Sequence, residues 1–235
     1  MVYVTADLHG YPLKDFQQLL NRAHFCDDDF LFVLGDVIDR NGDGGIEMLQ
    51  WMTMQPNVEL ILGNHEAMLL ACRFILEEVT EEYVRHLSID KIGSLENWLY
   101  NGAKPTILNM QALRKKDPEA LNSLIEYLQE APLYDTVSAG DKDFLLVHAG
   151  LGGFAKDKPL SSYDPDDLLW YRPKPEERFY DDVITILGHT PTKYYNMPNR
   201  MLQTPTWIDI DTGAAGGGAP MLLRLDDLQP FYIDS

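Results

Sequence analysis

Phe30-Leu-Phe-Val-Leu-Gly-Asp-Val-Ile-Asp-Arg40 is the stretch that decides the fold. Its apolar run, closed by a glycine and acidic residues, predicts a short buried strand that ends near Gly35. The same pattern recurs four more times, and each run leads to a metal-binding side chain beside a glycine. The other runs cover residues 2–6, 58–62, 144–147 and 183–187. Ligand sites of open α/β sheets lie beyond the carboxyl ends of the strands, so these five ends could converge on one site.

The side chains at these strand ends are typical of a metal centre for phosphate chemistry. Asp7 and His9 are two residues apart, so in an extended segment they point to the same side and could share one ion. Asp36 has two oxygens and could bridge that ion to a second. A neutral oxygen and two imidazoles complete a set that suits Mn, Fe or Zn better than Ca or Mg. These further candidate ligands are Asn64, His148 and His189.

Other residues near these ligands could supply the remaining chemistry. Two ions about 3.5–4 Å apart could hold a bridging hydroxide for in-line attack on phosphorus. His65 follows a candidate ligand directly and could donate a proton to the leaving alcohol, with Asp39 keeping it charged and oriented. Arg40 offers a two-pronged contact to phosphate oxygens.

The composition is strongly acidic, with 19 Lys and Arg against 37 Asp and Glu and a formal net charge of −18. Such a surface repels nucleic-acid backbones and anionic membranes, so we expect neither as a partner. A phosphorylated substrate would be repelled too, unless two divalent ions and one or two arginines reverse the sign locally.

The sequence predicts neither a membrane nor a secreted location. No apolar run approaches the length of a membrane span, and residues 1–6 predict a core strand instead of a signal peptide. Cys26 and Cys72 are too few for a disulfide framework, which indicates a reduced, cytoplasmic setting.

The order of the predicted elements indicates an α/β fold with a mainly helical insertion. Strands and helices alternate over residues 1–63, which predicts βαβ units and a parallel sheet. Helix-forming runs dominate residues 66–131, so this segment is predicted to be an insertion between the third and fourth ligand-bearing strands. A hairpin over residues 134–147 and strands at 206–211 and 221–225 predict a second, mixed or antiparallel sheet. A flexible glycine-rich hairpin connection would join the last two strands.

Short motifs along the chain form a recognisable series. The main ones are Asp7-Leu-His9-Gly10, Gly35-Asp36-Val-Ile-Asp39-Arg40, Gly63-Asn64-His65-Glu66, His148-Ala-Gly150 and Gly188-His189-Thr190. Together they resemble the calcineurin-like metallophosphoesterases. Within that family the chain is similar to the phosphoprotein phosphatase branch, which includes bacterial and lambda-phage serine/threonine phosphatases and symmetrical diadenosine tetraphosphatases. Trp98-Leu-Tyr-Asn-Gly102, Leu168-Leu-Trp-Tyr-Arg172 and Ile210-Asp-Thr-Gly213 also look like the bacterial members.

The resemblance covers nearly the whole chain and implies both a fold and roles for the motif residues. The fold would be one domain over residues 1–235, a four-layer α/β/β/α sandwich with a dinuclear metal site. One ion would be held by Asp7, His9 and Asp36. The other would be held by Asp36, Asn64, His148 and His189. His65 would be the general acid, paired with Asp39. The substrate phosphate would be bound by Arg40, Arg172 and Asn64.

Two positions depart from patterns within the family. Many phosphodiesterase branches place a second histidine two residues after the last motif histidine, where this chain has Pro191, and this favours the phosphatase branch. Protein phosphatases usually carry an arginine immediately before Gly63, where this chain has Leu62. The aromatic residues 98–100 and 170–171 could shape the substrate cleft, although packing is their expected role.

Three functions are open at this point. The leading one is a manganese-dependent phosphatase that hydrolyses phosphomonoesters, foremost phosphoserine or phosphothreonine in proteins, by attack of a metal-bridging hydroxide. The alternative is a symmetrical dinucleoside tetraphosphate hydrolase with the same metal centre. The third is a non-catalytic phosphate-binding scaffold, whose function His65→Ala would leave unchanged. Leu62 favours the second function, whereas Glu66, where the tetraphosphatases often have Asp, favours the first.

Overall fold

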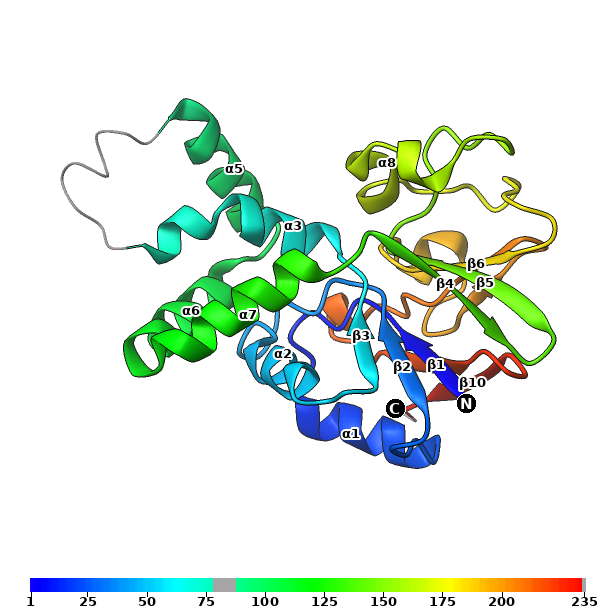
Figure 1. The fold of residues 1–235 in the computed structure, drawn as a ribbon, viewed down its shortest axis with the longest axis horizontal. Coiled ribbons are helices and arrows are strands. Elements are labelled where there is room, and N and C mark those ends of the chain that lie inside the picture. The colour runs from blue at the N-terminus through cyan, green and yellow to red at the C-terminus, as the bar shows by residue number, and fades with distance from the viewer. Residues whose placement is uncertain (78–87, 234–235) are drawn as a thin grey trace.

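Two five-stranded sheets packed face to face form the centre of the molecule (Figure 1). The computed structural model describes residues 1–77 and 88–233, and both sheets lie within these ranges. The strands are β1 (Val2–Thr5), β2 (Phe30–Val33), β3 (Val58–Leu60), β4 (Tyr134–Ala139), β5 (Lys142–Val147), β6 (Ile184–Leu187), β7 (Leu202–Gln203), β8 (Trp207–Asp209), β9 (Met221–Arg224) and β10 (Gln229–Tyr232). The first sheet has the order β10-β9-β1-β2-β3, and the second has the order β4-β5-β6-β8-β7.

The first sheet begins with the predicted βαβ units. β1, β2 and β3 run parallel, with Val2 opposite Phe30. Parallel neighbours need crossover connections, which α1 (Leu13–Arg22) and α2 (Ile46–Thr53) supply. β9 and β10 extend the other edge of the sheet in antiparallel pairing from β1.

The second sheet is mixed, as expected. β4 and β5 form the predicted hairpin, with Ala139 opposite Lys142 at its turn. β5, β6 and β8 run parallel to one another, and β7 pairs antiparallel with β8 at the edge. Each sheet therefore contains three adjacent parallel strands, whose carboxyl ends can present side chains to one site.

Three apolar cores separate the layers. The first fills the space between the two sheets, where Phe32 of β2 belongs to the same buried cluster as Phe144 of β5. The second lies between the first sheet and the helices that cover it. The third lies on the outer face of the second sheet, where Trp207 clusters with Leu168 of the short helix α8 (Pro165–Leu169). This order of layers is the α/β/β/α sandwich that the family resemblance implied.

The segment between β3 and β4 is mainly helical in its described part. It contains α3 (Asn64–Ala71), a 3-10 turn (Arg73–Leu76), α5 (Ile89–Tyr100), α6 (Lys104–Lys116) and α7 (Pro118–Glu130). Residues 78–87 of the predicted insertion lie outside the described residues. In Figure 1, α5, α6 and α7 extend from one side of the sheets, while α8 lies on the other. No helix within residues 1–77 and 88–233 combines the length and the apolar character needed to cross a bilayer.

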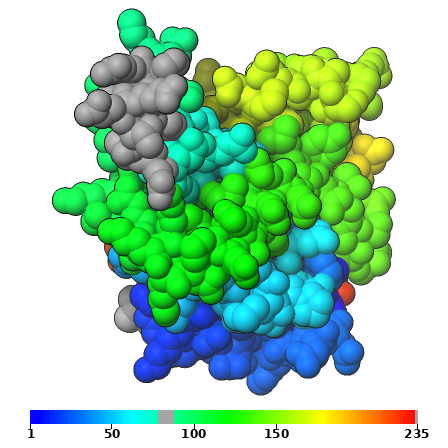
Figure 2. All heavy atoms as spheres, turned by 60° about the vertical axis from the view of Figure 1, so that its left-hand side comes forward, coloured from blue at the N-terminus to red at the C-terminus, as the bar shows by residue number. Residues whose placement is uncertain are grey.

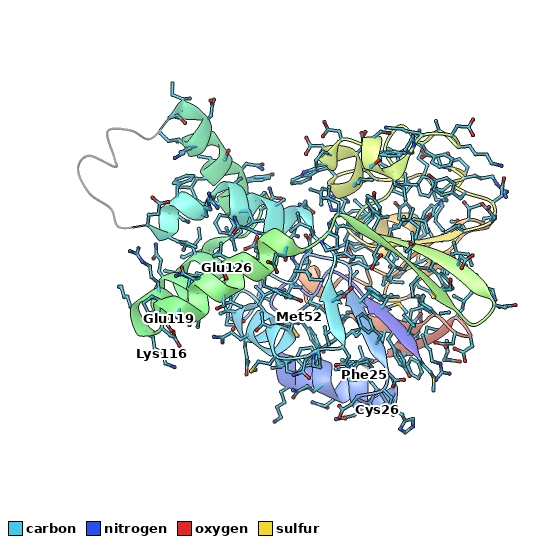
Figure 3. The ribbon with its side chains drawn as sticks, viewed as in Figure 1. Phe25, Cys26, Met52, Lys116, Glu119 and Glu126 are labelled. Carbon is cyan, nitrogen blue, oxygen red and sulfur yellow. The ribbon has the colours of Figure 1, made fainter. Side chains whose placement is uncertain are left out.

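α7 packs the insertion against the body of the molecule. Leu121, Leu124 and Leu128 follow one face of this helix at helical spacing and are buried in the core that also contains Met52 of α2. Figure 3 shows Met52 lying toward α7, whereas Lys116 lies at the far end of the α6–α7 pair, away from the sheets. The space-filling view shows α6 and α7, in green, covering one face of the molecule above the blue and cyan N-terminal segments (Figure 2).

The connection after β8 differs from the expectation. β9 was expected in the second sheet, but it pairs with β1 of the first. The glycine-rich segment therefore crosses between the two sheets instead of closing a hairpin, and it contains a 3-10 turn at Ala214–Gly216. The hydrophobic pattern predicts that a strand exists, but its neighbour depends on packing across the whole chain.

Candidate metal centre

The ends of five strands meet at one place in the structure. The loop after β6 reaches the loop after β1, because the backbone nitrogen of His189 donates to Oδ2 of Asp7 at 2.8 Å. The loops after β2 and β5 meet where Nε2 of His148 lies 3.5 Å from Oδ1 of Asp36. Asn64, which begins α3 after β3, has its Oδ1 2.9 Å from ring nitrogens of both His148 and His189. The structure thus brings these five candidate ligands together from distant parts of the chain.

Glycines allow these loops to approach closely. Gly35 has a φ of 76°, and a Cβ there would lie 2.4 Å from the Cα of Gly63, in the loop after β3. A Cβ on Gly188 would lie 2.1 Å from Oδ2 of Asp7. Larger residues at these positions would push the strand ends apart, which explains why a glycine stands beside the ligands in the sequence.

Two groups of side chains in this region could each hold a metal ion. Within each group, the ligand atoms lie within 4.8 Å of one another. Asp36 belongs to both groups, which is the position expected of a bridging ligand. Asp7 belongs to neither, although its Oδ1 lies 3.9 Å from Nε2 of His9. The groups are His9, Asp36 and His65, and Asp36, His148 and His189.

The free polar atoms of this cluster fit divalent cations. Oδ1 of Asp7 and Nε2 of His189 are buried and have no hydrogen-bond partner among the described residues. Nδ1 of His9 and Nδ1 of His148 each contact a backbone carbonyl, at 3.0 and 2.7 Å. Donation from Nδ1 fixes the tautomer of both rings and leaves Nε2 with a lone pair for a metal. Carboxylate and imidazole donors in this combination suit Mn, Fe or Zn.

The electrostatics of the cluster also favour a cation. Burial, together with repulsion from Asp211 and Asp36, raises the pKa of Asp7 well above its usual value. Burial acts in the same direction on Asp36, but attraction to histidines, foremost His148 and then His65, outweighs it and holds the pKa of Asp36 below its usual value. Burial lowers the pKa of His9 to about 3 and the pKa of His189 to about 2, so both rings are neutral. A divalent cation would relieve the repulsion between the acids and accept the imidazole lone pairs.

The backbone of the candidate site adopts an uncommon conformation. Of the ten described non-glycine residues with positive φ, six are site residues that the sequence predicted. Each such residue costs about 1–3 kcal/mol, and it persists only where surrounding contacts fix it, as happens at functional sites. The six are Asp7 (55°), His9 (44°), Asp36 (55°), Asp39 (75°), Arg40 (69°) and His189 (68°).

His65 and Asp39 form a buried pair beside the cluster. Nδ1 of His65 lies 2.6 Å from Oδ2 of Asp39. Burial alone would lower the pKa of His65, but the charges of Asp36 and Asp39 outweigh burial and raise that pKa. On the other side of the ring, Nη2 of Arg40 lies 3.2 Å from Nε2. A guanidinium can only donate, so Nε2 accepts a hydrogen bond in this contact.

A cavity of about 420 Å³ opens onto the cluster, and both predicted phosphate-binding arginines line it. Arg172 donates from Nη1 to the backbone oxygen of His189 and to Oγ1 of Thr190, at 3.2 and 3.0 Å. These bonds hold Arg172 beside the group that contains His189. Residues predicted for the metal centre and residues of the rim share the lining; among the latter are Asn101, Trp170, Pro191, Tyr194 and Ala215.

Three residues support the candidate site through contacts that the sequence did not predict. The Glu66 carboxylate accepts hydrogen bonds from three successive backbone N–H groups that begin at Asp36, at 2.8, 2.9 and 3.2 Å. Its place in the Gly-Asn-His-Glu motif was a signal that could have identified it. Trp98 and Thr106 donate to the Asp39 carboxylate at 2.7 and 2.6 Å. No local pattern connects these two residues to Asp39, because they lie 59 and 67 positions away.

Comparison with known proteins agrees with this geometry. The family model for calcineurin-like phosphoesterases matches residues 1–210. The chain belongs to the calcineurin-like phosphoesterase family. Members of this family depend on metals, and the two candidate metal-binding groups of this phosphoesterase are consistent with that property.

Two kinds of relative resemble this phosphoesterase in sequence. A symmetrical bis(5'-nucleosyl)-tetraphosphatase of Buchnera aphidicola is 31% identical over 102 residues, which are 42% of this chain and 37% of that protein. The chain therefore spans well under half the length of that relative. Serine/threonine-protein phosphatase 1 of Salmonella typhimurium is 28% identical over 245 residues, which cover 95% of this chain and 91% of that protein.

Solved structures of low sequence identity share the fold of this phosphoesterase. A protein provisionally assigned as a diadenosine tetraphosphatase superimposes with a TM-score of 0.65 at 14% identity, covering 99% of this chain and 92% of that chain. A protein serine/threonine phosphatase from Saccharomyces cerevisiae gives a TM-score of 0.56 at 14% identity, covering 100% of this chain and 80% of that chain.

Proposed function

We propose that this chain is a metal-dependent phosphatase for phosphomonoesters, with phosphoserine and phosphothreonine of proteins as its leading substrates. One observation carries the proposal. Candidate metal ligands line one cavity together with two arginines and with His65, which pairs with Asp39; these ligands are His9, Asp36, Asn64 and His189. This combination would provide ligands for two ions, a general acid and two arginines that bind phosphate. A scaffold that only binds phosphate would not require the His65–Asp39 pair.

The candidate ligands could hold two ions, with Asp36 available to both. When bound, the ions, which we propose to be Mn with Fe or Zn as alternatives, would supply an activated water and neutralise charge on the phosphate. Their protein ligands would be Asp7, His9 and Asp36 for one, and Asp36, Asn64, His148 and His189 for the other. The buried, unpaired atoms of Asp7 and His189 support this assignment.

Arg40 and Arg172 would hold the substrate phosphate, together with Asn64. Both arginines have exposed side chains and line the cavity, so their guanidinium groups can reach an anion there. Arg40 would have to turn away from His65 as it binds phosphate. This movement frees Nε2 of His65, which can then carry the proton that an acid needs.

His65 would complete the reaction as the general acid. A water oxygen forms the new bond to phosphorus while the bond from phosphorus to the leaving oxygen breaks. The electron pair of that bond stays on the leaving oxygen, which takes the proton from Nε2 of His65. Asp39 accepts the hydrogen bond from Nδ1 and so fixes the orientation of the ring. The attacking water loses a proton to solvent, and His65 takes up a proton from solvent, so the site returns to its starting charge.

The phosphoprotein reading rests on the relative of matching length. The Salmonella typhimurium phosphatase aligns along nearly the whole chain, whereas the tetraphosphatase of Buchnera aphidicola aligns over 42% of it.

A specific observation favours the second candidate, hydrolysis of dinucleoside tetraphosphates. Trp170 and Tyr194 line the cavity and are 37% and 70% exposed, so their rings are accessible for stacking on a nucleobase.

Product analysis separates these functions. Manganese-loaded protein would be given a phosphothreonine peptide and diadenosine tetraphosphate in parallel. We expect free phosphate from the peptide and an intact dinucleotide. Release of two ADP from the dinucleotide, with the peptide untouched, would assign the chain to the second candidate. If neither compound reacts in protein that holds its metal, the proposal of a phosphatase is wrong.

A further inference from the structure

The corner between α5 and α6 reaches into the candidate active site. This α5–α6 corner comprises residues 98–106 and belongs to the helical insertion. Oδ2 of Asp39 accepts a hydrogen bond from Nε1 of Trp98 at 2.7 Å, beside its 2.6 Å contact with His65. Oδ1 of Asp39 accepts from Oγ1 of Thr106 at 2.6 Å. Both carboxylate oxygens are therefore occupied, and rotation of the carboxylate away from His65 would break these bonds.

These contacts are deeply buried. Asp39 and Thr106 have no exposed surface, and Trp98 is 1% exposed. A buried carboxylate is costly unless donors replace the water that it has lost. Trp98 and Thr106 provide two of these donors from outside the βαβ core, and His65 provides the third.

The α5–α6 corner also holds the backbone of residues 39 and 40. Both residues have positive φ, at 75° and 69°. The backbone nitrogen of Asp39 donates to Oγ1 of Thr106 at 3.0 Å, and the backbone nitrogen of Arg40 donates to the carbonyl of Gly102 at 3.0 Å. Thr106 thus contacts both the backbone and the side chain of Asp39. Such contacts keep a strained backbone in place.

From these contacts we infer that Trp98 and Thr106 are positioning residues, which orient Asp39 so that His65 can deliver its proton to the leaving oxygen. The inference rests on the proposed acid role of His65. It gives the helical insertion a part in catalysis in addition to its packing. Neither residue lines the cavity, so their removal should affect proton delivery more than phosphate binding.

Leaving-group dependence tests this inference. Trp98→Phe keeps an aromatic ring but removes the indole N–H, and Thr106→Val keeps the shape but removes the hydroxyl. A nitrophenolate leaves without help from an acid, whereas an alkoxide needs the proton. We expect each variant to lower kcat for an alkyl phosphate about tenfold, part of the roughly 100- to 10,000-fold that a general acid contributes. With p-nitrophenyl phosphate, kcat should change less than twofold, and KM should stay unchanged for both substrates.

Matched variants separate positioning from packing. Trp207 is also fully buried, and its Nε1 donates to the backbone oxygen of Glu177 at 3.0 Å in another part of the molecule. Trp207→Phe should therefore lose a comparable hydrogen bond and some thermal stability without any leaving-group effect. Thr106→Ser retains the hydroxyl and should restore the rate of Thr106→Val. In an Asp39→Asn background, Trp98→Phe should cause no further loss of alkyl phosphatase activity.

His65→Gln distinguishes failure of this inference from failure of the proposed function. If His65→Gln loses activity selectively on the alkyl phosphate while Trp98→Phe and Thr106→Val lose both activities equally, the two residues only pack and the inference is wrong. If His65→Gln itself shows no selectivity for the poor leaving group, the acid role fails and the proposed mechanism fails with it.

Discussion

The strand-end loops and the helical insertion differ in the residues that they bury. The loops after β1, β2 and β6 carry polar, buried and conformationally strained residues, and the strands before them fix their positions. The helices α5, α6 and α7 carry leucines and methionines that fill the core against the first sheet. One region concentrates reactive groups at a cost in stability, and the other contributes stability.

The difference shows how the two regions depend on each other. Six site residues with positive φ and several buried charges are unfavourable by themselves. Packing of the insertion offsets part of that cost, and its α5–α6 corner contacts the site directly at Asp39. We therefore expect variants in the loops to change chemistry, and variants in the insertion core outside the α5–α6 corner to change stability.

The largest expected effect is that of Asp36→Asn on activity. Asp36 belongs to both candidate metal-binding groups, so losing its charge should weaken both ions at once. We expect kcat/KM to fall about 1,000-fold or more, the loss typical when a centre of charge stabilisation is removed. Steady-state hydrolysis of p-nitrophenyl phosphate with added manganese would measure it. Asp141→Asn, which changes an 88% exposed side chain, is the matched control and should keep full activity.

Leu124→Ala tests whether the helical insertion contributes stability. Leu124 of α7 is 2% exposed, and its truncation should lower the free energy of unfolding by about 2–5 kcal/mol. Urea denaturation would measure the loss, with Leu108→Ala, at a 56% exposed position, as a control expected within about 0.5 kcal/mol of the parent. The kcat of the folded variant should stay unchanged. A large fall in kcat without a change in stability would mean that the insertion core serves the site directly.

Arg40→Ala should weaken binding of phosphate. A charge-assisted hydrogen bond contributes about 1.5–3 kcal/mol, so the inhibition constant of inorganic phosphate should rise roughly 10- to 100-fold. Competition against p-nitrophenyl phosphate would measure this constant. Arg178→Ala removes an exposed arginine that pairs with Asp181, and it should leave the constant unchanged. Equal constants in parent and Arg40→Ala would show that Arg40 does not bind the substrate phosphate.

The smallest effect, counted for each pH unit, is on the pH dependence of stability. It is measured as the difference between the metal-stripped parent and His189→Asn. His189 has a folded-state pKa lowered to about 2, first by burial, against 6.5 in the unfolded chain. Below pH 6.5 the unfolded state binds a proton that the folded state does not, so stability is lost as the pH falls. Relative to His189→Asn, the metal-stripped parent should lose about 1.4 kcal/mol for each pH unit between pH 6 and 4. Parallel curves would show that His189 is not buried as a neutral ring.

Much of the fold could be predicted from the sequence because its signals are local. Five apolar runs ending at glycines located β1, β2, β3, β5 and β6, and the motifs that follow them identified the family. The sheet to which β9 belongs could not be predicted, because strand pairing depends on contacts across the whole chain. The helix over Lys104–Lys116 was not recognised as a separate element within the helical insertion.

The candidate site also contains residues that could be predicted from the sequence and residues that could not. Residues next to strand ends, such as Asp36 and His189, were recognisable because a short motif surrounds them. The contacts of Trp98 and Thr106 with Asp39 were not recognisable. Trp98 stands in a motif, but an aromatic residue in a helix more often packs, and the two contacts span 59 and 67 positions. Sequence motifs identified the residues proposed to react, and three-dimensional contacts were needed to find the residues that support them.

The central claim is that the strand-end loops form a centre for two divalent ions. Its most direct test is the number of manganese ions bound per chain after chelation, reconstitution and dialysis, measured by atomic emission. We expect two ions for the parent, and fewer for His9→Ala and His189→Ala, which each remove a member of one group. A parent protein that retains no manganese, or one with two ions whether or not His9 and His189 are present, would contradict the account.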